Sequence, residues 1–194
     1  MNNNNDLNTK QGTIHLLRHG KTTAGSAYIG STDVALTALG WEQMQSSVEQ
    51  YLMANSPWDC ILTSPLQRCS KFAQVLADQL SIPLVVKNPL REYHFGDWEN
   101  KTALQVMDQY PNMLELFWSD PLHNPPHNGE TLSQFSERID AVLAEVKLSD
   151  SHKKPLLICH GGVMRYLLSQ EQKLPISSML DFPVDHGQLM SISY

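Results

Sequence analysis

The sequence predicts an α/β fold with a mostly parallel sheet. Three short apolar runs, at 13–17, 58–62 and 155–159, stop abruptly at polar residues beside Gly or Pro, as buried parallel strands do. Segments with capping residues and a helical spacing of apolar side chains lie between these runs. Strands that alternate with helices are typical of α/β domains. A chain of 194 residues suits roughly one such domain.

The first expected strand, 13–17, runs into an Arg-His-Gly tripeptide at 18–20. Thr37 is then suited to cap a helix that reaches about Ala54. The apolar positions along this helix are Leu39, Met44, Val48, Tyr51 and Leu52.

The second expected strand, 58–62, is followed by Ser64 and Pro65. A serine before a proline fits an N-cap with proline at the first helical position, and we expect this helix to run to about Leu80. Residues 84–86 are a further strand candidate.

Residues from about 100 to 130 interrupt the alternation of strands and helices. A Thr-x-x-Gln pair at 102–105 predicts a capped helix that ends at Pro111, and a stretch rich in proline and histidine follows at 121–128. We interpret this segment as a small cap-like excursion that folds over the edge of the sheet, within one domain of residues 12–194.

The alternation resumes after the excursion. A second Thr-x-x-Gln capping box, at 131–134, predicts a helix that continues to about Lys147. The third strand, 155–159, precedes a shorter helix candidate at 163–169. Residues 190–194 are suited to close the chain as an edge strand.

Composition narrows the function classes. The chain has 14 Lys and Arg against 20 Asp and Glu, a net charge of −6, and no basic run, so we do not expect a nucleic-acid binder. No apolar stretch reaches the roughly 20 residues that span a bilayer. Residues 1–11 lack the apolar segment of a signal peptide, which predicts a disordered tail and a cytoplasmic protein. Three cysteines without C-x-x-C spacing favour neither a disulfide framework nor a zinc site.

Polar groups follow each expected strand at the sheet edge where ligands bind in parallel α/β folds. These groups are Arg18 and His19, then Ser64 with Arg68 one helical turn later, then His160. Arginine donates bidentate hydrogen bonds, and neighbouring glycines let the backbone approach closely. The sequence therefore predicts a pocket for a tetrahedral oxyanion, although the protein as a whole is anionic.

Two other patterns do not predict a site. His15 and His19 are four residues apart, which on a helix would suit a metal pair, but on a strand about 13 Å separates them. Cys159 precedes His160, yet adjacent strand residues point to opposite faces, so we expect Cys159 in the core rather than as a nucleophile.

Six blocks resemble, in order, those of the histidine phosphatase superfamily, also called the phosphoglycerate mutase-like family. They are 16–20, 30–40, 63–68, 90–99, 129–131 and 160–162. The resemblance implies a three-layer α/β/α fold with a mostly parallel central sheet and a small cap insertion.

The resemblance also implies catalytic roles. His19 would be the nucleophile that forms a phosphohistidine, and Arg18, Arg68 and a protonated His160 would bind the phosphate oxygens. Glu92 would protonate the leaving oxygen and later activate water. These positive groups make a metal unnecessary, and no cofactor is expected.

Further residues have supporting roles by the same resemblance. Thr22 and Gly161 are candidates for phosphate binding. Ser64 either binds phosphate or only caps its helix. Glu130 either orients His19 or Arg18, or only favours the dipole of the helix that follows it.

The sequence departs from the family pattern at three positions. Gly25 stands where many members have Asn, which implies a missing phosphate contact or loop brace. Asn100 stands where Gly is frequent, and Phe72 replaces a common Thr. None of these is a proposed catalytic residue, so the departures concern substrate fit rather than the reaction.

The length and the Phe-Gly-Asp-Trp-Glu run at 95–99 resemble the small phosphatases of the family more than its cofactor-dependent mutases. We therefore expect a phosphatase acting on a small phosphomonoester. The alternatives are a broad-specificity phosphatase, a phosphoglycerate mutase, a phosphoprotein phosphatase with an open site, and an inert binding module. Trp118, His123 and His127 either stack on a ligand ring or pack within the cap.

Overall fold

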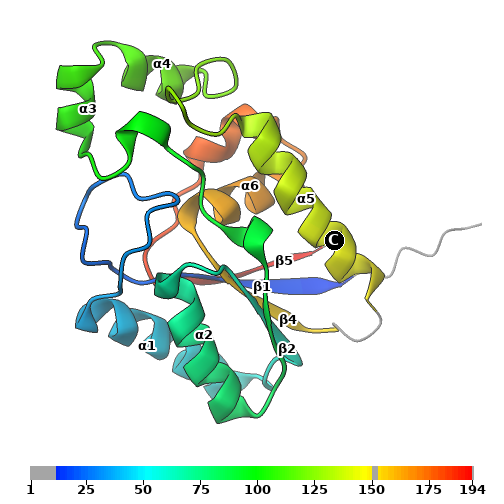
Figure 1. Cartoon of the computed structure of the whole chain (residues 1–194). Coiled ribbons are helices and arrows are strands. Elements are labelled where there is room, and N and C mark those ends of the chain that lie inside the picture. Colours follow the sequence, from blue (N-terminus) through cyan, green and yellow to red (C-terminus); the bar gives the residue numbers. More distant parts are fainter. Residues whose placement is uncertain (1–11, 150–152, 194) are drawn as a thin grey trace, which may run out of the picture.

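The computed structural model describes residues 12–149 and 153–193, and the tail expected at 1–11 lies outside them. The described residues form a five-stranded sheet in the order β3-β2-β4-β1-β5 (Figure 1). Neighbouring strands are parallel, except that β5 runs antiparallel to β1 at one edge. The bounds are β1 Thr13–Arg18, β2 Cys60–Thr63, β3 Leu84–Val86, β4 Pro155–Cys159 and β5 Leu189–Ser193. The mostly parallel sheet and its closing edge strand are confirmed.

Helices cover both faces of the sheet, which confirms the three-layer arrangement. Helices α1 and α2 lie on one face, and α5 and α6 lie on the other (Figure 1). Their bounds are α1 Ala38–Ala54, α2 Gln67–Leu80, α5 Leu132–Leu148 and α6 Gly161–Glu171. Successive side chains of β1 pack against opposite helical layers, because the side chains of a strand point alternately to the two faces of the sheet. Leu17 packs with α1 and α2, whereas Leu16 packs with α5 and α6.

Two predicted helix starts are confirmed by their caps. Thr37 Oγ1 accepts a hydrogen bond from the Gly40 N–H at 3.0 Å at the start of α1. Thr131 and Gln134 form a reciprocal capping box at the start of α5.

The start predicted for α2 is wrong by two residues. The helix begins at Gln67, whose backbone N–H donates to Asp33 Oδ1 at 2.8 Å. Ser64 instead accepts a hydrogen bond from the Leu66 N–H at 3.3 Å. Because an aspartate from a distant loop serves the helix N-terminus, the Ser64 side chain is available to the site.

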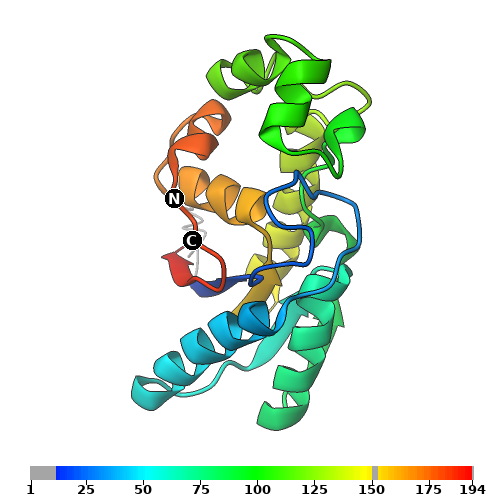
Figure 2. The same cartoon turned by 90° about the vertical axis from the view of Figure 1, so that its left-hand side faces the viewer.

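The excursion at about 100–130 contains two short helices that lie beyond the α5 and α6 layer (Figures 1 and 2). They are α3 Ala103–Gln109 and α4 Met113–Ser119. Helix α3 has the predicted capping box of Thr102 and Gln105. The sequence did not predict α4, because Pro111 ends α3 and Asn112, with a φ of +65°, turns the chain before the second helix begins.

Short 3₁₀ helices complete the described chain. They are η1 Asn88–Leu90, η2 Gly96–Trp98 and η3 Ile176–Asp181. The last of them packs against α6, which extends beyond the predicted 163–169 at both ends. Within residues 12–149 and 153–193, no helix is both long and apolar enough to cross a membrane.

Candidate active site

Three elements bring the predicted catalytic residues together at the carboxyl edge of the sheet. Arg18 ends β1, and His19 continues the ladder by donating its backbone N–H to Cys159 O at 3.0 Å. His160 follows β4 and is the N-cap of α6. The ring centroids of His19 and His160 lie 5.2 Å apart. Arg68 on α2 and His160 are fully buried, and His19 is nearly so.

The contacts of the His19 ring leave its Nε2 without a proton. Its Nδ1 lies 2.8 Å from Gly20 O, so Nδ1 carries the proton and donates it to this carbonyl. Burial lowers the pKa of His19 well below its usual 6.5, and the positive charges of Arg68 and Arg18 lower it further. The imidazole is therefore neutral at neutral pH, and Nε2 keeps its lone pair.

Arg18 presents donors to the same place. Its Nη1 donates to Val184 O at 2.6 Å, while the buried Nε has no hydrogen-bond partner among the described residues. A Cβ on Gly161 would lie 3.1 Å from this Nε, so the glycine leaves room beside the guanidinium group. A buried N–H without a partner is costly, and an anionic oxygen would satisfy it.

Arg68 is not free to form the bidentate clamp that the sequence suggested. Its Nη1 donates to Thr32 O at 2.8 Å, and its Nη2 donates to Gly30 O at 2.7 Å and Ile29 O at 3.4 Å. Its Nε donates to His160 Nδ1 at 3.2 Å. These bonds engage four of the five guanidinium N–H groups, which leaves one donor for phosphate.

The contacts and the burial of His160 favour a neutral ring over the protonated one that is expected from the sequence. Because Nδ1 accepts from Arg68, the ring proton is on Nε2, which donates to Ser64 Oγ at 2.8 Å. Burial lowers the pKa of His160 well below 6.5, and Arg68 and His19 lower it further. Ser64 thus holds His160 in the site instead of capping α2.

The Glu92 carboxylate is fixed at the N-terminus of α6. Its Oε2 accepts from the Gly162 N–H and its Oε1 from the Tyr93 N–H, both at 2.9 Å. Burial lowers the pKa of Arg18, and the charge of Glu92 opposes this shift. The interaction is consistent with a carboxylate that lies close to the predicted phosphate site.

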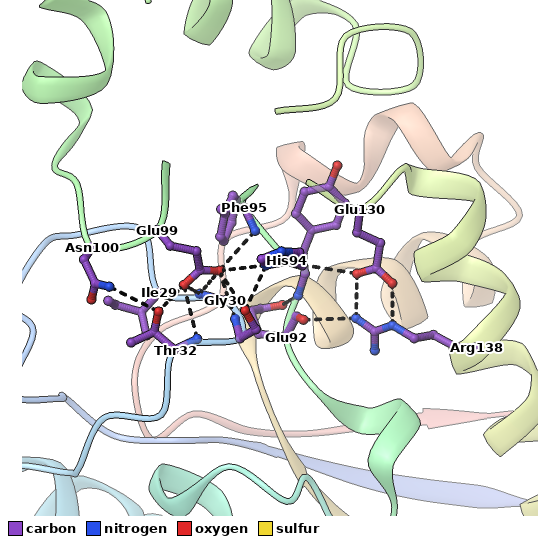
Figure 3. A network of polar contacts seen from close by, with 12 residues as sticks. Ile29, Gly30, Thr32, Glu92, His94, Phe95, Glu99, Asn100, Glu130 and Arg138 are labelled. Carbon is purple, nitrogen blue, oxygen red and sulfur yellow. Dashed lines mark hydrogen bonds and ion pairs between the residues drawn. The ribbon is translucent and has the colours of Figure 1, made fainter. Parts of the chain in front are cut away.

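Glu130 supports the site through Arg138, and not by contacting His19 or Arg18. Its Oε1 and Oε2 accept from Arg138 Nε at 2.6 Å and Nη2 at 2.8 Å (Figure 3). Arg138 Nη2 also donates to the Glu92 carbonyl at 3.0 Å. This ion pair braces the backbone that carries Glu92.

The remaining sequence candidates lie in loops. Thr22 follows β1, and its backbone pairs with Leu36 in an isolated bridge. Gly25 and Asn100 both have a φ of +64°, in the left-handed region that Gly and Asn adopt most readily. The residues that depart from the family pattern at these two positions are therefore both suited to a left-handed backbone. Phe72 is buried in the α1 and α2 layer.

Sequence reasoning missed His186, whose ring centroid lies 5.6 Å from that of His19. The next residue, Gly187, donates its N–H to His19 O at 3.2 Å. Burial and then the charge of Arg18 are the main causes that lower the pKa of His186 to about 4. A signal was present in the sequence, since His186, like His19 and His160, comes directly before a glycine.

A cavity of about 260 Å³ lies next to Glu92, between α4 and η3. Aromatic side chains make up much of its wall, namely Tyr28, Tyr93, Phe95, Phe117 and Trp118. Trp118 is thus at the cavity, as one sequence interpretation suggested. His123 and His127 are not among the lining residues, and each forms an exposed pair with an aspartate.

Replacing Gly162 by alanine should disturb the Glu92 carboxylate. The new Cβ would come within 2.4 Å of Glu92 Oε1, so the carboxylate must move. Misplacement of a catalytic group by about 1 Å can cost about 10² in rate. We expect kcat/KM for a phosphomonoester to fall by about that factor while the far-UV circular dichroism stays the same. Unchanged kcat/KM would show that Glu92 has more freedom than these contacts allow.

Acid should destabilise the fold through the two buried histidines. His19 and His160 have pKa values well below 6.5, so between pH 6.5 and those values the unfolded chain binds more protons than the folded one. The free energy of unfolding should therefore fall as the pH falls, by about 1.4 kcal/mol per pH unit for each histidine. Urea unfolding at a series of pH values between about 7 and 5.5 measures this slope. A flat profile across that range would contradict it.

Known proteins with similar sequences have related activities. Residues 14–194 match the model of the histidine phosphatase superfamily (branch 1). An adenosylcobalamin/α-ribazole phosphatase of Escherichia coli (strain K12) is 30% identical over 176 residues, which cover 90% of this chain and 86% of the relative. A glucosyl-3-phosphoglycerate phosphatase of Mycolicibacterium vanbaalenii is 31% identical over 172 residues, which cover 84% of this chain and 75% of the relative.

Solved structures show the same similarity in three dimensions. The α-ribazole phosphatase from Shigella flexneri superposes with a TM-score of 0.81 at 29% identity, over 92% of this chain and 89% of that one. The native mycobacterial glucosyl-3-phosphoglycerate phosphatase gives a TM-score of 0.82 at 25% identity, over 95% and 91%. The fold, the site geometry and these matches agree, and the chain belongs to the histidine phosphatase superfamily.

Proposed function

We propose that this phosphatase hydrolyses small phosphomonoesters through a phosphohistidine at His19. The observation that carries the proposal is the buried, neutral His19 ring, whose Nδ1 proton is held by Gly20 O at 2.8 Å, because this leaves Nε2 as the nucleophile. Arg18 Nε and the remaining N–H of Arg68 would donate to the equatorial oxygens, over which transition-state charge is spread. The Nε2–H of His160, which bonds to Ser64 Oγ at 2.8 Å, would be shared with one of these oxygens.

Two steps complete the reaction. In the first, His19 Nε2 attacks phosphorus and the bond to the leaving oxygen breaks, while a protonated Glu92 gives that oxygen its proton. In the second, the Glu92 carboxylate takes a proton from water, whose oxygen attacks phosphorus, and the bond between His19 and phosphorus breaks. The products are an alcohol and phosphate, and both residues return to their starting forms.

The proposed substrate is α-ribazole 5′-phosphate, which would place the enzyme in cobalamin biosynthesis. The general-acid segment at 90–99 and the overall length resemble phosphatases of this substrate, and two of the similar proteins carry that name. The cavity beside Glu92 supports the choice, because its aromatic walls suit the flat heterocyclic base of the nucleoside. The Tyr93 hydroxyl is buried without a hydrogen-bond partner among the described residues, so it is suited to a polar atom of the leaving group.

A second candidate substrate is glucosyl-3-phosphoglycerate, the substrate named for another relative. Arg165 lines the cavity and is the feature that favours this carboxylate-bearing substrate. Its Nε is already bound to Phe182 O at 2.9 Å, and the remaining walls are largely apolar, so we prefer the nucleotide. A cytoplasmic location, and the lack of nucleic-acid and membrane partners, stay predictions from the sequence.

A substrate panel tests the choice. We expect kcat/KM for α-ribazole 5′-phosphate to exceed that for glucosyl-3-phosphoglycerate, 3-phosphoglycerate, nucleotides and sugar phosphates. Replacing Trp118 by alanine should raise KM for α-ribazole 5′-phosphate more than for 3-phosphoglycerate, which has no ring to stack. Comparable rates on the whole panel would instead indicate a broad-specificity phosphatase.

Trapping the intermediate tests the chemistry. Acid-labile label should appear on His19 when the enzyme is denatured during turnover of a ³²P-labelled ester. Activity should persist in the presence of a metal chelator. Label on another residue, or activity that disappears with the chelator, would contradict the mechanism.

A further inference from the structure

Glu99 lies outside the proposed catalytic set, yet its carboxylate is tied to one loop by many bonds. The side chain is 13% exposed. Its Oε1 accepts from the Gly30 N–H at 3.1 Å and the Ser31 N–H at 2.9 Å. Its Oε2 accepts from the Thr32 N–H at 3.2 Å and from Thr32 Oγ1 at 2.6 Å (Figure 3). A carboxylate that accepts this many hydrogen bonds holds the loop at 30–32 in one conformation.

The other side of this loop holds Arg68. The carbonyls of Gly30 and Thr32 accept from its guanidinium group at 2.7 and 2.8 Å. The same two residues therefore direct their N–H groups to Glu99 and their C=O groups to Arg68. Within the described parts of the chain no carboxylate pairs directly with Arg68, which is fully buried. The polarised residues between the two charges link them, since hydrogen bonds in a chain strengthen one another.

The loop has little room to adjust. A Cβ at Gly30 would lie 1.9 Å from Tyr93 O and 2.5 Å from Glu99 Oε1, so only glycine fits there. The Asn100 N–H donates to Tyr28 O at 2.9 Å, which fastens the start of the loop to the residue after Glu99. The position of Glu99 thus determines the positions of the Gly30 and Thr32 carbonyls that bind Arg68.

Arg68 in turn decides the state of His160. Its Nε–H points at His160 Nδ1 at 3.2 Å, and this bond keeps the ring proton on Nε2. If the carbonyls moved, the guanidinium group would turn and the bond would be lost. The tautomer of His160 would then depend on Ser64 Oγ, which lies 2.8 Å from Nε2 and can either accept or donate, so Nε2 would not always carry the proton.

We propose that Glu99 is a positioning residue, which acts through the loop at 30–32 and Arg68 to keep the ring proton of His160 on Nε2, where it bonds to Ser64 Oγ at 2.8 Å and can be shared with a phosphoryl oxygen. The inference rests on the proposed function, because it takes His160 as a phosphate ligand. Glu99 would thus contribute to the reaction without touching the substrate.

The test is Glu99→Gln, followed by ¹⁵N NMR of the His160 ring and by kinetics. An amide presents only one acceptor oxygen, so part of the loop loses its partner. We expect kcat/KM to fall by about tenfold to a hundredfold. The two His160 nitrogens should change from one protonated and one bare nitrogen to averaged signals. A variant that is merely less stable would not change these signals.

Glu130→Gln is the matched control, because the Glu130 side chain is also 13% exposed and also accepts hydrogen bonds, but from Arg138. It should lower the rate while the His160 signals stay as in the wild type. In an Arg68→Ala background, Glu99→Gln should have almost no further effect on rate, because residues that act as one unit are not additive.

Two outcomes overturn the proposal. One is a Glu99→Gln enzyme with a lower rate but unchanged His160 signals, and the other is full additivity with Arg68→Ala. Should Glu99→Gln fail to fold, Thr32→Val removes the 2.6 Å bond to Glu99 Oε2, together with the 3.3 Å bond that Thr32 Oγ1 accepts from Asn100, and should shift the same signals in part. Label trapped on His19 is the separate readout of the proposed function, and it should still form, slowly, in Glu99→Gln.

Discussion

Replacing His19 by alanine should lower kcat by about 10⁴ to 10⁶, the largest effect of any single substitution in the chain. The variant keeps the arginines around the phosphate but has no nitrogen to attack phosphorus. Binding of phosphate should be affected far less, because Arg18, Arg68 and His160 remain. Steady-state kinetics and a phosphate-binding measurement on the same preparation separate the two effects.

His15→Ala is the matched control, because His15 lies in β1, the strand that ends just before His19. The His15 ring lies against Tyr51, with Nε2 3.1 Å from the tyrosine hydroxyl, and is not part of the site. This variant should keep its activity and lose only stability. If His19→Ala retained a substantial rate, a different nucleophile would be required and the phosphohistidine mechanism would be wrong.

Replacing Glu92 by glutamine should lower kcat by about 10² to 10⁴ for an alkyl phosphate, because the leaving alkoxide then has no proton donor. The loss should be much smaller for p-nitrophenyl phosphate, whose leaving group is stable without a proton. The oxygen of the new amide could still accept from the Gly162 N–H, so binding should change little. The measurement is the ratio of the two rates in the wild type and in the variant.

Glu130→Gln again supplies the comparison. Glu130 braces the Glu92 backbone and donates no proton in the proposed mechanism, so its loss should reduce both rates by a similar factor. An equal effect of Glu92→Gln on both substrates would show that Glu92 positions groups but does not act as the acid.

The order of strands and helices could be predicted from the sequence because its signals are local. Short apolar runs that end at polar residues identified β1, β2 and β4, and the capping residues Thr37 and Thr131 identified the starts of α1 and α5. The meeting of Arg18, Arg68 and His160 followed from one general property, that the carboxyl ends of parallel strands lie at one edge.

The errors and omissions arose where partners distant in the chain decide the outcome. The start of α2 depends on Asp33, whose carboxylate accepts from the Gln67 N–H. Asp33 lies in a separate loop, so the helix sequence itself gives no sign of this contact. The role of Glu130 depends on the contact of Arg138 with the Glu92 carbonyl, 46 residues away, and the proton on His160 depends on Arg68, 92 residues away. Such pairs leave no spacing in the sequence from which they could be predicted.

The sequence by itself therefore determined the fold class, the edge of the sheet where the site lies and the residue types that carry the chemistry. Only the tertiary structure decided their states, namely a neutral His19 with Nε2 free to attack, a neutral His160 and an Arg68 held by the carbonyls of a distant loop. The physical reason is that periodicity and capping act within a few residues, whereas protonation and hydrogen bonding depend on burial and on every neighbour in space.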